Sequence, residues 1–235
     1  MSELSAFEPE SELLPETLPD EPFGLFQSWF DEAWAARRVP NAHAFALATA
    51  DPDGSPSVRM VLCKDIRPDP GYVVFYTNYQ GAKGRALSAN PRAAACFHWD
   101  HFSRQARISG PVVKSPPAES DAYFKTRHWT SRIGAWASAQ SEPIESHDEL
   151  LAKVGAVIEK LDLDMMALMR LDEGGPGVEI PRPAHWGGYR LFAERMELWC
   201  GGEGRVHDRA VWTRELTPDG EGFTGGEWSC TRLQP

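Results

Sequence analysis

The stretch from Arg59 to Arg85 constrains the fold more than any other part of the sequence. Its Val-, Tyr- and Phe-rich segments predict two strands, Val58–Lys64 and Tyr72–Thr77. The Asp-Pro-Gly sequence within Pro68–Gly71 predicts the tight turn between them. A glycine-containing turn then leads into a helix that begins near Gly81. We therefore expect a hairpin that is followed at once by a helix.

This stretch contains more charged and hydroxyl-bearing residues than a hairpin needs in order to fold. They are cations at both ends of the first strand, hydroxyl groups at the end of the second, and a lysine in the first helical turn: Arg59, Lys64, Tyr76, Thr77 and Lys83. Because helix N-termini favour anions, a lysine there is electrostatically unfavourable unless an anion is also present. The stretch is thus a candidate phosphate site, although a solvated edge hairpin explains the same residues equally well.

Short strands joined by turns continue on both sides of the hairpin. We predict further strands at Ala44–Ala50, Ala93–Trp99, Arg104–Val113, Trp186–Phe192, Met196–Trp199, Val206–Thr213 and Trp228–Leu233. Predicted helices cover Pro22–Arg38, Ala82–Ser88, Ala118–Thr126, Ile133–Ser138 and His147–Leu161, and Leu171–Pro183 is predicted to be a loop. Because most early strands are linked as hairpins, this order favours a mainly β, antiparallel barrel or sandwich with peripheral helices.

Composition indicates one globular domain behind an acidic tail. The 235 residues are 42% hydrophobic and 25% charged, as in soluble globular proteins. Residues 1–21 contain seven acidic residues, three prolines and no Lys or Arg. We expect them to be a mostly disordered tail and residues 22–235 to form a single domain.

Several classes of partner and location are disfavoured. The net charge of −10 argues against nucleic acid. No apolar run is long enough to cross a membrane, and no basic and apolar leader is evident. The cysteines Cys63, Cys96, Cys200 and Cys230 are widely spaced, which fits a reducing cytoplasm better than zinc binding or a disulfide framework.

A second candidate site follows the glycine-rich turn after Cys200. Arg205, His207 and Arg209 stand at i, i+2 and i+4 in a predicted strand, so they should share one face. If that face borders a cavity, it is suited to recognise a phosphate or an electron-rich ring. Trp199 lies just before the turn and is either a packing partner for a planar ligand or ordinary core.

A third candidate set is Tyr123, Arg127 and Ser131, spaced four residues apart. On one continuous helix they would project from the same side and offer donors to phosphate oxygens, but His128-Trp129-Thr130 favours helix poorly. Arg59 and Lys64 fall on opposite faces of a regular strand, so both reach one ligand only if the strand bulges or ends between them.

Other polar residues and motifs narrow the chemistry. Gln105, Gln140 and Ser141 are suited to bind the edge of a heteroaromatic ring, or are simply satisfied buried groups. No dinucleotide fingerprint, P-loop, nucleophile elbow or ligand-spaced histidine cluster is present, so we predict no metal site. Cations and amides without an obvious nucleophile indicate a cofactor that carries the chemistry itself.

The sequence resembles the pyridoxine (pyridoxamine) 5′-phosphate oxidase family from about Pro22 to Pro235. The motifs occur in the family's order: R-M-V-L-C-K, F-Y-T-N, N-P-R, R-Q-A-R-I-S-G, Y-F-x-x-R, I-G-A-W-A-S-x-Q-S, W-G-G-Y-R and W-x-G-G-x-x-R-x-H-D-R. The resemblance implies an FMN-binding split β-barrel and a homodimer whose flavin lies between the subunits.

The resemblance also implies the ligand sets. FMN would be held by Arg59, Met60, Val61, Leu62, Lys64, Tyr76, Thr77, Lys83, Gln105, Gln140, Ser141, Trp199 and Arg209. The vitamin B6 phosphate substrate would bind Lys64, Tyr123, Arg127 and Ser131, with Arg205 and His207 as catalytic residues over its ring. The family often has Arg-Lys where this chain has Ala82-Lys83, and Arg85 is a candidate replacement for the missing cation.

The implied reaction is oxidation of pyridoxamine or pyridoxine 5′-phosphate to pyridoxal 5′-phosphate. A hydride would pass from C4′ to flavin N5, and O2 would reoxidise the flavin. Two alternatives are a related flavin oxidase of phenazine biosynthesis and a split-barrel protein that binds flavin or pyridoxal phosphate without turnover.

Overall fold

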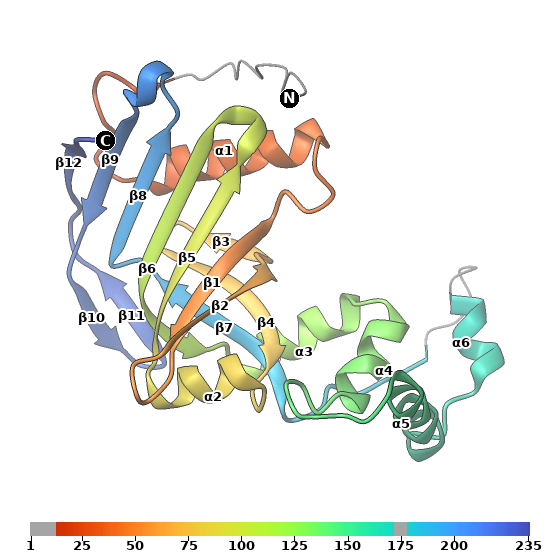
Figure 1. Cartoon of the computed structure of the whole chain (residues 1–235). Helices are drawn as coiled ribbons and strands as arrows, with labels where there is room; N and C mark the ends of the chain where they lie inside the picture. The colour runs from red at the N-terminus through yellow and green to blue at the C-terminus, as the bar shows by residue number, and fades with distance from the viewer. Residues whose placement is uncertain (1–12, 172–177) are drawn as a thin grey trace.

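The computed structural model describes residues 13–171 and 178–235. Within them, a ten-stranded antiparallel sheet forms the body of the molecule (Figure 1). The strands are β1 Ala44–Ala50, β2 Pro56–Leu62, β3 Asp65–Arg67, β4 Tyr72–Asn78, β5 Arg92–Trp99, β6 Arg104–Lys114, β7 Trp186–Phe192, β8 Arg195–Cys200, β9 Asp208–Thr213 and β12 Ser229–Leu233. A separate two-stranded sheet consists of β10 Leu216–Asp219 and β11 Gly222–Gly225.

The long strand β6 divides the sheet into two halves. Its residues Arg104–Ser109 pair with β8, whereas Val112–Lys114 pair with β7. One half therefore runs in the order β12-β9-β8-β6-β5-β1-β2, and the other contains β3, β4 and β7. The sheet curls between these halves, which brings the edge strand β2 near β4.

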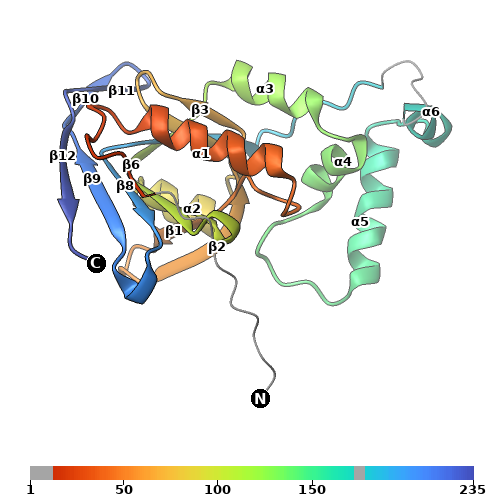
Figure 2. The same ribbon diagram turned by 90° about the horizontal axis from the view of Figure 1, so that it is seen from above.

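Alternating apolar residues place the core on the inward face of the sheet. In β1, for example, Phe45, Leu47 and Thr49 are buried while the residues between them are partly exposed. Helix α1 Phe23–Ala36 lies across this face (Figures 1 and 2) and buries Phe26 against Phe97, with ring centroids 5.1 Å apart. This packing fixes the first half of the sheet.

Helix α2 Ala82–Ala89 packs against β1 and buries Leu87 in the main core. The helices α3 Pro117–Thr126, α4 Trp129–Ala137, α5 His147–Lys160 and α6 Met165–Leu171 form a second packing unit. Phe124, Ile133, Val157, Leu168 and Trp186 bury one another in a smaller core. Figure 2 shows α4, α5 and α6 on the opposite side of the molecule from β9 and β12.

Residues 13–21 of the acidic segment lie against the sheet. Leu14 is buried, and its backbone N–H donates to Asp208 Oδ2 at 3.1 Å. The Trp212 indole donates to the Pro19 carbonyl oxygen at 2.9 Å, and Arg232 donates to the Pro15 carbonyl oxygen at 2.6 Å. The expected disordered tail thus does not extend through this part, and its residues 1–12 lie outside the described residues.

Five elements differ from the expectation. Strands β3, β10 and β11 and helix α6 are additional. Helix α6 ends at Leu171, the first residue of the predicted loop, and residues 172–177 of that loop lie outside the described residues. Helix α4 begins at Trp129 rather than near Ile133, because the His128 side chain accepts a hydrogen bond from the Thr130 N–H and caps the helix.

No helix among the described residues is long and apolar enough to span a lipid bilayer.

Candidate functional site

A cleft of about 330 Å³ opens where β2, β4, α2 and α3 meet. We call it the cationic cleft. It is lined by Arg59, Met60, Val61, Leu62, Lys64, Tyr76, Thr77, Lys83, Tyr123, Arg127, Gln140 and Trp186. All but the last are residues that the sequence analysis singled out, and they come from parts of the chain that are far apart.

The end of strand β2 allows Arg59 and Lys64 to reach the same cleft. Strand β2 ends at Leu62, and Lys64 lies in the link to β3, where its N–H donates to the Val74 carbonyl oxygen at 2.8 Å. The Arg59 guanidinium is held by the Thr49 hydroxyl at 2.7 Å and by the Ser57 hydroxyl at 2.7 Å. The strand thus ends between Arg59 and Lys64, which is one of the two ways in which both side chains can reach one ligand.

Lys83 is fixed at the start of α2 by polar groups of the cleft. Its Nζ donates to Gln140 Oε1 at 2.7 Å and to Thr77 Oγ1 at 3.1 Å. A Cβ atom on Gly81 would lie 2.7 Å from Gln140 Oε1, so a larger residue there would displace this amide from Lys83. Ser141 Oγ accepts the Ala82 N–H at 3.2 Å at the same helix end. Backbone donors, a lysine and an amide thus converge at a helix N-terminus, which suits a phosphate group.

Three stacked aromatic rings form one wall of the cleft. Tyr76 and Tyr123 stack with centroids 4.0 Å apart and planes 19° apart, and Tyr76 also stacks on Trp186 at 5.5 Å. The Arg127 guanidinium lies 4.4 Å from the Trp186 ring centroid. Its Nη1 is buried and lacks a hydrogen-bond partner among the described residues. A buried, unpaired guanidinium nitrogen is a ready donor for an anionic ligand.

Burial lowers the pKa of every cation in the cleft. For Arg59 and Lys83, desolvation is the main cause of the lowered pKa, and Arg59 further lowers the pKa of Lys83. For Lys64 and Arg127, desolvation again dominates, and the nearby Arg127 charge further lowers the pKa of Lys64. Among the described residues these four side chains form no ion pair with a carboxylate. Their charges are therefore available to an anion.

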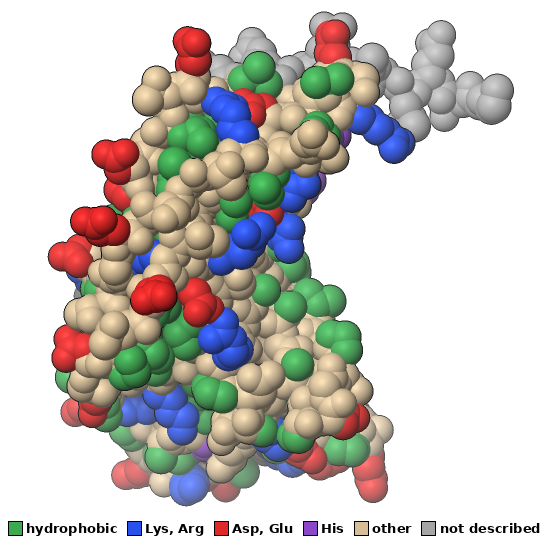
Figure 3. All heavy atoms as spheres, turned by 90° about the vertical axis from the view of Figure 1, so that its left-hand side faces the viewer, with side chains coloured by type: hydrophobic (Ala, Val, Ile, Leu, Met, Phe, Trp, Pro, Cys, Tyr) green, Lys and Arg blue, Asp and Glu red, His purple; other side chains and the backbone are tan. Residues whose placement is uncertain are grey.

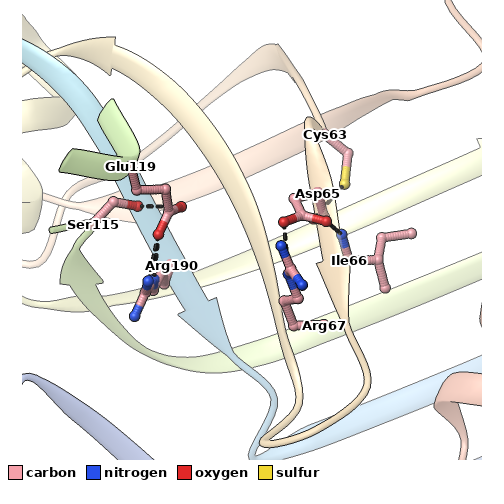
Figure 4. A network of polar contacts seen from close by, with 7 residues as sticks. All are labelled: Cys63, Asp65, Ile66, Arg67, Ser115, Glu119 and Arg190. Carbon is pink, nitrogen blue, oxygen red and sulfur yellow. Dashed lines mark hydrogen bonds and ion pairs between the residues drawn. The ribbon is translucent and has the colours of Figure 1, made fainter. Parts of the chain in front are cut away.

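Carboxylates beside the cleft are already engaged (Figure 4). Glu119 accepts hydrogen bonds from Ser115 Oγ at 3.0 Å and from Arg190 Nε at 3.0 Å. Asp65 binds Arg67 Nε at 2.7 Å. On the face seen in Figure 3, many Asp and Glu side chains lie along one margin, and Lys and Arg side chains lie in the middle as well as toward the top and bottom. The net negative charge of the chain therefore does not neutralise the cations of the cleft.

A second group of predicted residues forms a row on the outward face of the sheet. The strand register pairs Gln105 with Trp199 and Trp199 with Arg209, so their side chains share one face. Arg59 is paired with Leu47, whose side chain is in the core. Paired residues share a face, so Arg59 lies on the inward face of the sheet and not on the face of this row. Within one chain, the row and the cationic cleft do not meet.

Arg205 and His207 do not share a strand face with Arg209, and this expectation was wrong. Strand β9 begins at Asp208, while Arg205 closes a 3-10 turn, Glu203–Arg205, with a φ of 65°. Gly204, with a φ of 60°, lets the turn continue further than the sequence suggested. His207 still lies beside Trp199, with ring centroids 4.7 Å apart, and its Nδ1 accepts the Gly202 N–H at 3.2 Å.

Two further predicted residues lie outside the cleft. Helix α3 ends before Arg127, whose backbone is extended, so Ser131 is on a second helix and does not line the cleft. Arg85 binds Glu142 at 2.7 Å and the Gln80 carbonyl oxygen at 2.6 Å. It therefore does not replace the cation that is missing at Ala82.

Two further residues, one in the cleft and one in contact with Lys64, were not predicted from the sequence. Trp186 supports both Tyr76 and Arg127, and its place in the motif W-G-G-Y-R was the available signal. His43 lies with Nε2 3.4 Å from Lys64 Nζ, a contact between residues 21 positions apart that no local pattern indicates. No group of three or more His, Cys, Asp or Glu side chains in the described ranges is arranged to hold a metal ion.

Family comparisons cover nearly the whole chain. Residues 30–160 match the model described as pyridoxamine 5′-phosphate oxidase, and residues 186–235 match the pyridoxine 5′-phosphate oxidase C-terminal dimerisation region. A pyridoxine/pyridoxamine 5′-phosphate oxidase from Cupriavidus necator is 44% identical over 217 residues, which are 92% of this chain and 90% of the relative. The resemblance stated from the sequence motifs is confirmed.

Solved structures agree on the fold. PhzG from Burkholderia lata, in complex with tetrahydrophenazine-1-carboxylic acid, is 30% identical with a TM-score of 0.78 and covers 95% of this chain and 98% of its own. A pyridoxamine 5′-phosphate oxidase-related, FMN-binding protein from Nostoc punctiforme is 17% identical with a TM-score of 0.64, covering 93% of this chain and 100% of its own. The expected split-barrel fold is thereby confirmed.

Proposed function

Because the chain belongs to the pyridoxamine 5′-phosphate oxidase family, we propose that it is an FMN-dependent oxidase of vitamin B6 phosphates. It converts pyridoxamine 5′-phosphate, pyridoxine 5′-phosphate or both to pyridoxal 5′-phosphate, with O2 as electron acceptor. The observation that carries the proposal is the cationic cleft, in which Arg59, Lys64, Lys83 and Arg127 lie together without carboxylate partners in the described structure. Such a cleft suits ligands that carry phosphate groups.

The residues around α2 fit the phosphate end of FMN. Lys83 and the N-terminus of α2 supply positive charge, and Thr77, Gln140 and Ser141 supply or orient hydrogen-bonding groups. The Arg59–Leu62 segment of the edge strand β2 lines the same cleft and offers backbone groups to the flavin ring. When bound, FMN supplies the redox chemistry, by accepting electrons from C4′ of the substrate and passing them to O2.

The opposite wall of the cleft fits the substrate phosphate. Lys64 and Tyr123 point to the same space, with Lys64 Nζ 5.9 Å from the Tyr123 ring centroid, and Arg127 offers its unpaired Nη1. Anchoring the phosphate here orients the reacting carbon and makes the reaction effectively intramolecular. We keep Ser131 as a further phosphate ligand that would require α4 to adjust.

Assembly of a homodimer would complete the site. The family match to a dimerisation region supports two copies, and the outward sheet face supplies an apolar surface, since Val58 and Met60 are 68% and 64% exposed. The same face carries Gln105, Trp199 and Arg209. Two copies packed through it would bring this row, with the substrate-orienting Arg205 and His207, to the cleft of the other copy.

A cytoplasmic location is part of the proposal. All four cysteines are free, and Cys63 and Cys200 are buried, as expected for a protein of a reducing compartment.

The structural likeness to PhzG favours one alternative, a flavin oxidase acting on a non-phosphorylated tricyclic substrate. The phosphate-binding character of Lys64, Tyr123 and Arg127 argues against it. A flavin-binding protein without turnover is the second alternative, and the Arg205 and His207 pair argues against that.

One assay separates the three possibilities. FMN-loaded protein is mixed with each B6 phosphate in air, and pyridoxal 5′-phosphate formation is measured together with oxygen uptake. We expect both signals with at least one of the two substrates. Oxygen uptake only with a tricyclic carboxylic acid, or no turnover at all, would reject the proposal.

A further inference from the structure

A buried carboxylate lies on the outward sheet face next to the proposed flavin-binding row. Glu197 of β8 is 3% exposed, although this face is otherwise open in the single chain. Three guanidinium groups surround it: Arg209 Nη2 lies 2.7 Å from Oε1, and Arg195 Nη2 and Arg107 Nη1 lie 3.1 and 3.5 Å from Oε2. They come from three neighbouring strands, β9, β8 and β6.

Arg209 depends on Glu197 more than the other two arginines do. Its side chain is 25% exposed, against 43% for Arg195 and 56% for Arg107, and its contact with the carboxylate is the shortest. Its Nη1 also donates to the Gln234 carbonyl oxygen at 3.3 Å, and its Nε is buried without a partner in the described structure. The orientation of this guanidinium is therefore set mainly by Glu197.

The sheet does not require this ion cluster to hold its strands together. Backbone pairing joins Arg104–Ser109 of β6 to all of β8, and β8 to all of β9. At such a position, well-packed apolar residues usually stabilise a protein as well as a buried ion pair does. One carboxylate surrounded by three guanidinium groups leaves positive charge in excess, which points to a role in binding an anionic ligand.

We propose that Glu197 is a positioning residue that holds the Arg209 guanidinium beside Trp199 in the orientation that binds the flavin. The inference rests on the proposed function, in which Arg209 contacts FMN. With Glu197 in place, the carboxylate engages Nη2 of Arg209, Nη1 makes only the longer contact with the Gln234 carbonyl oxygen, and Nε has no partner in the described structure. Without it, Arg107, Arg195 and Arg209 repel one another, and Arg209 leaves that orientation.

A double-mutant cycle on FMN affinity tests this role. The dissociation constant is measured by quenching of FMN fluorescence on titration with apo-protein, for the wild type, Glu197→Gln, Arg209→Ala and the double variant. We expect Glu197→Gln to raise the constant about tenfold in the wild-type background. In the Arg209→Ala background the same change should have an effect within about twofold, because the residue through which Glu197 acts is absent.

The matched control is Arg195→Gln, which removes another partner of the same carboxylate and leaves the Glu197–Arg209 contact in place. We expect its FMN affinity to stay within about twofold of the wild type. Size-exclusion chromatography and the melting temperature of each apo-variant identify any variant whose assembly or folding has changed. If Glu197→Gln does not fold, Glu197→Asp, which keeps the charge but shortens its reach, should weaken FMN binding in the same Arg209-dependent way.

Equal loss of affinity in both backgrounds would overturn the inference, because Glu197 would then act on the fold and not through Arg209. Unchanged affinity of Glu197→Gln, with a wild type that binds FMN, would overturn this inference alone. A wild type that does not bind FMN would overturn the proposed function and this inference with it.

Discussion

Lys83 donates a hydrogen bond to Gln140 Oε1 at 2.7 Å, although the two residues are 57 positions apart. The bond ties the N-terminus of α2 to the turn that follows α4. It also keeps the ammonium group in the cleft, where it would otherwise be repelled by the positive end of its own helix. The pair is thus arranged for an anion that neither residue supplies.

Substitution of Lys83 by Met should weaken FMN binding. The change removes a charge-assisted hydrogen bond, for which we expect a loss of about 1.5–3 kcal/mol, or roughly 10- to 150-fold in the dissociation constant. Fluorescence titration of apo-protein with FMN measures it. The matched control is Lys114→Met, because Lys114 lies over the Tyr79 ring at 4.5 Å and does not line the cleft. Equal affinities of the two variants would contradict the assignment.

Substitution of Arg127 by Lys should raise KM for the B6 phosphate substrate and leave FMN bound. A lysine keeps the charge but loses the planar stack on Trp186 and the forked donors that suit phosphate. We expect KM to rise about tenfold or more. Steady-state kinetics with FMN in excess provide the measurement. Lys125→Ala, at an exposed position near the end of α3, is the control, and a similar KM for both variants would argue against a phosphate contact.

Substitution of Arg205 by Ala should abolish most turnover while the protein stays yellow. In the proposed function this residue orients the substrate ring and stabilises charge in the transition state, a role typically worth about 100-fold or more in kcat. The neighbouring Val206, which is 75% exposed, offers Val206→Ala as a control. Loss of the flavin instead of turnover would show that Arg205 binds the cofactor.

Stability should decline in mildly acidic solution because of His43. Burial and, secondarily, the charge of Lys64 lower the pKa of His43 below its usual value of 6.5. Between that lowered pKa and 6.5 the unfolded chain binds a proton that the folded chain does not. The stabilisation is therefore complete above pH 6.5 and is lost as the pH falls toward the lowered pKa.

Urea unfolding of the wild type and of His43→Gln across this pH range measures the effect. The wild type should lose stability more steeply than the variant as the pH falls. His98→Gln, at an exposed histidine, is the control and should follow the wild type. Parallel curves for the wild type and His43→Gln would refute the assignment.

The sequence predicted the sheet well wherever strands alternate strictly. β1, β5 and β6 follow the expected ranges closely because alternating burial gives a local signal. The short strand β3 and the hairpin β10–β11 lack such a signal, since they are only three and four residues long. Their pairing is set by tertiary contacts.

Most residues of the cleft could be predicted from the sequence, but their arrangement in space could not. That Arg59 and Lys64 share one cleft depends on where β2 ends, and the position of Arg205 depends on how far the turn at Gly204 continues. The roles of His43 and Glu197 depend on contacts between distant segments. Periodicity within one segment contains no information about such contacts.

The most direct test of the account is the visible spectrum of the FMN-loaded protein before and after anaerobic addition of pyridoxamine 5′-phosphate or pyridoxine 5′-phosphate. The account predicts that at least one of them bleaches the flavin absorbance and that admission of O2 restores it, with pyridoxal 5′-phosphate as product. A flavin band that remains unchanged with both substrates, in protein that demonstrably holds FMN, would contradict it.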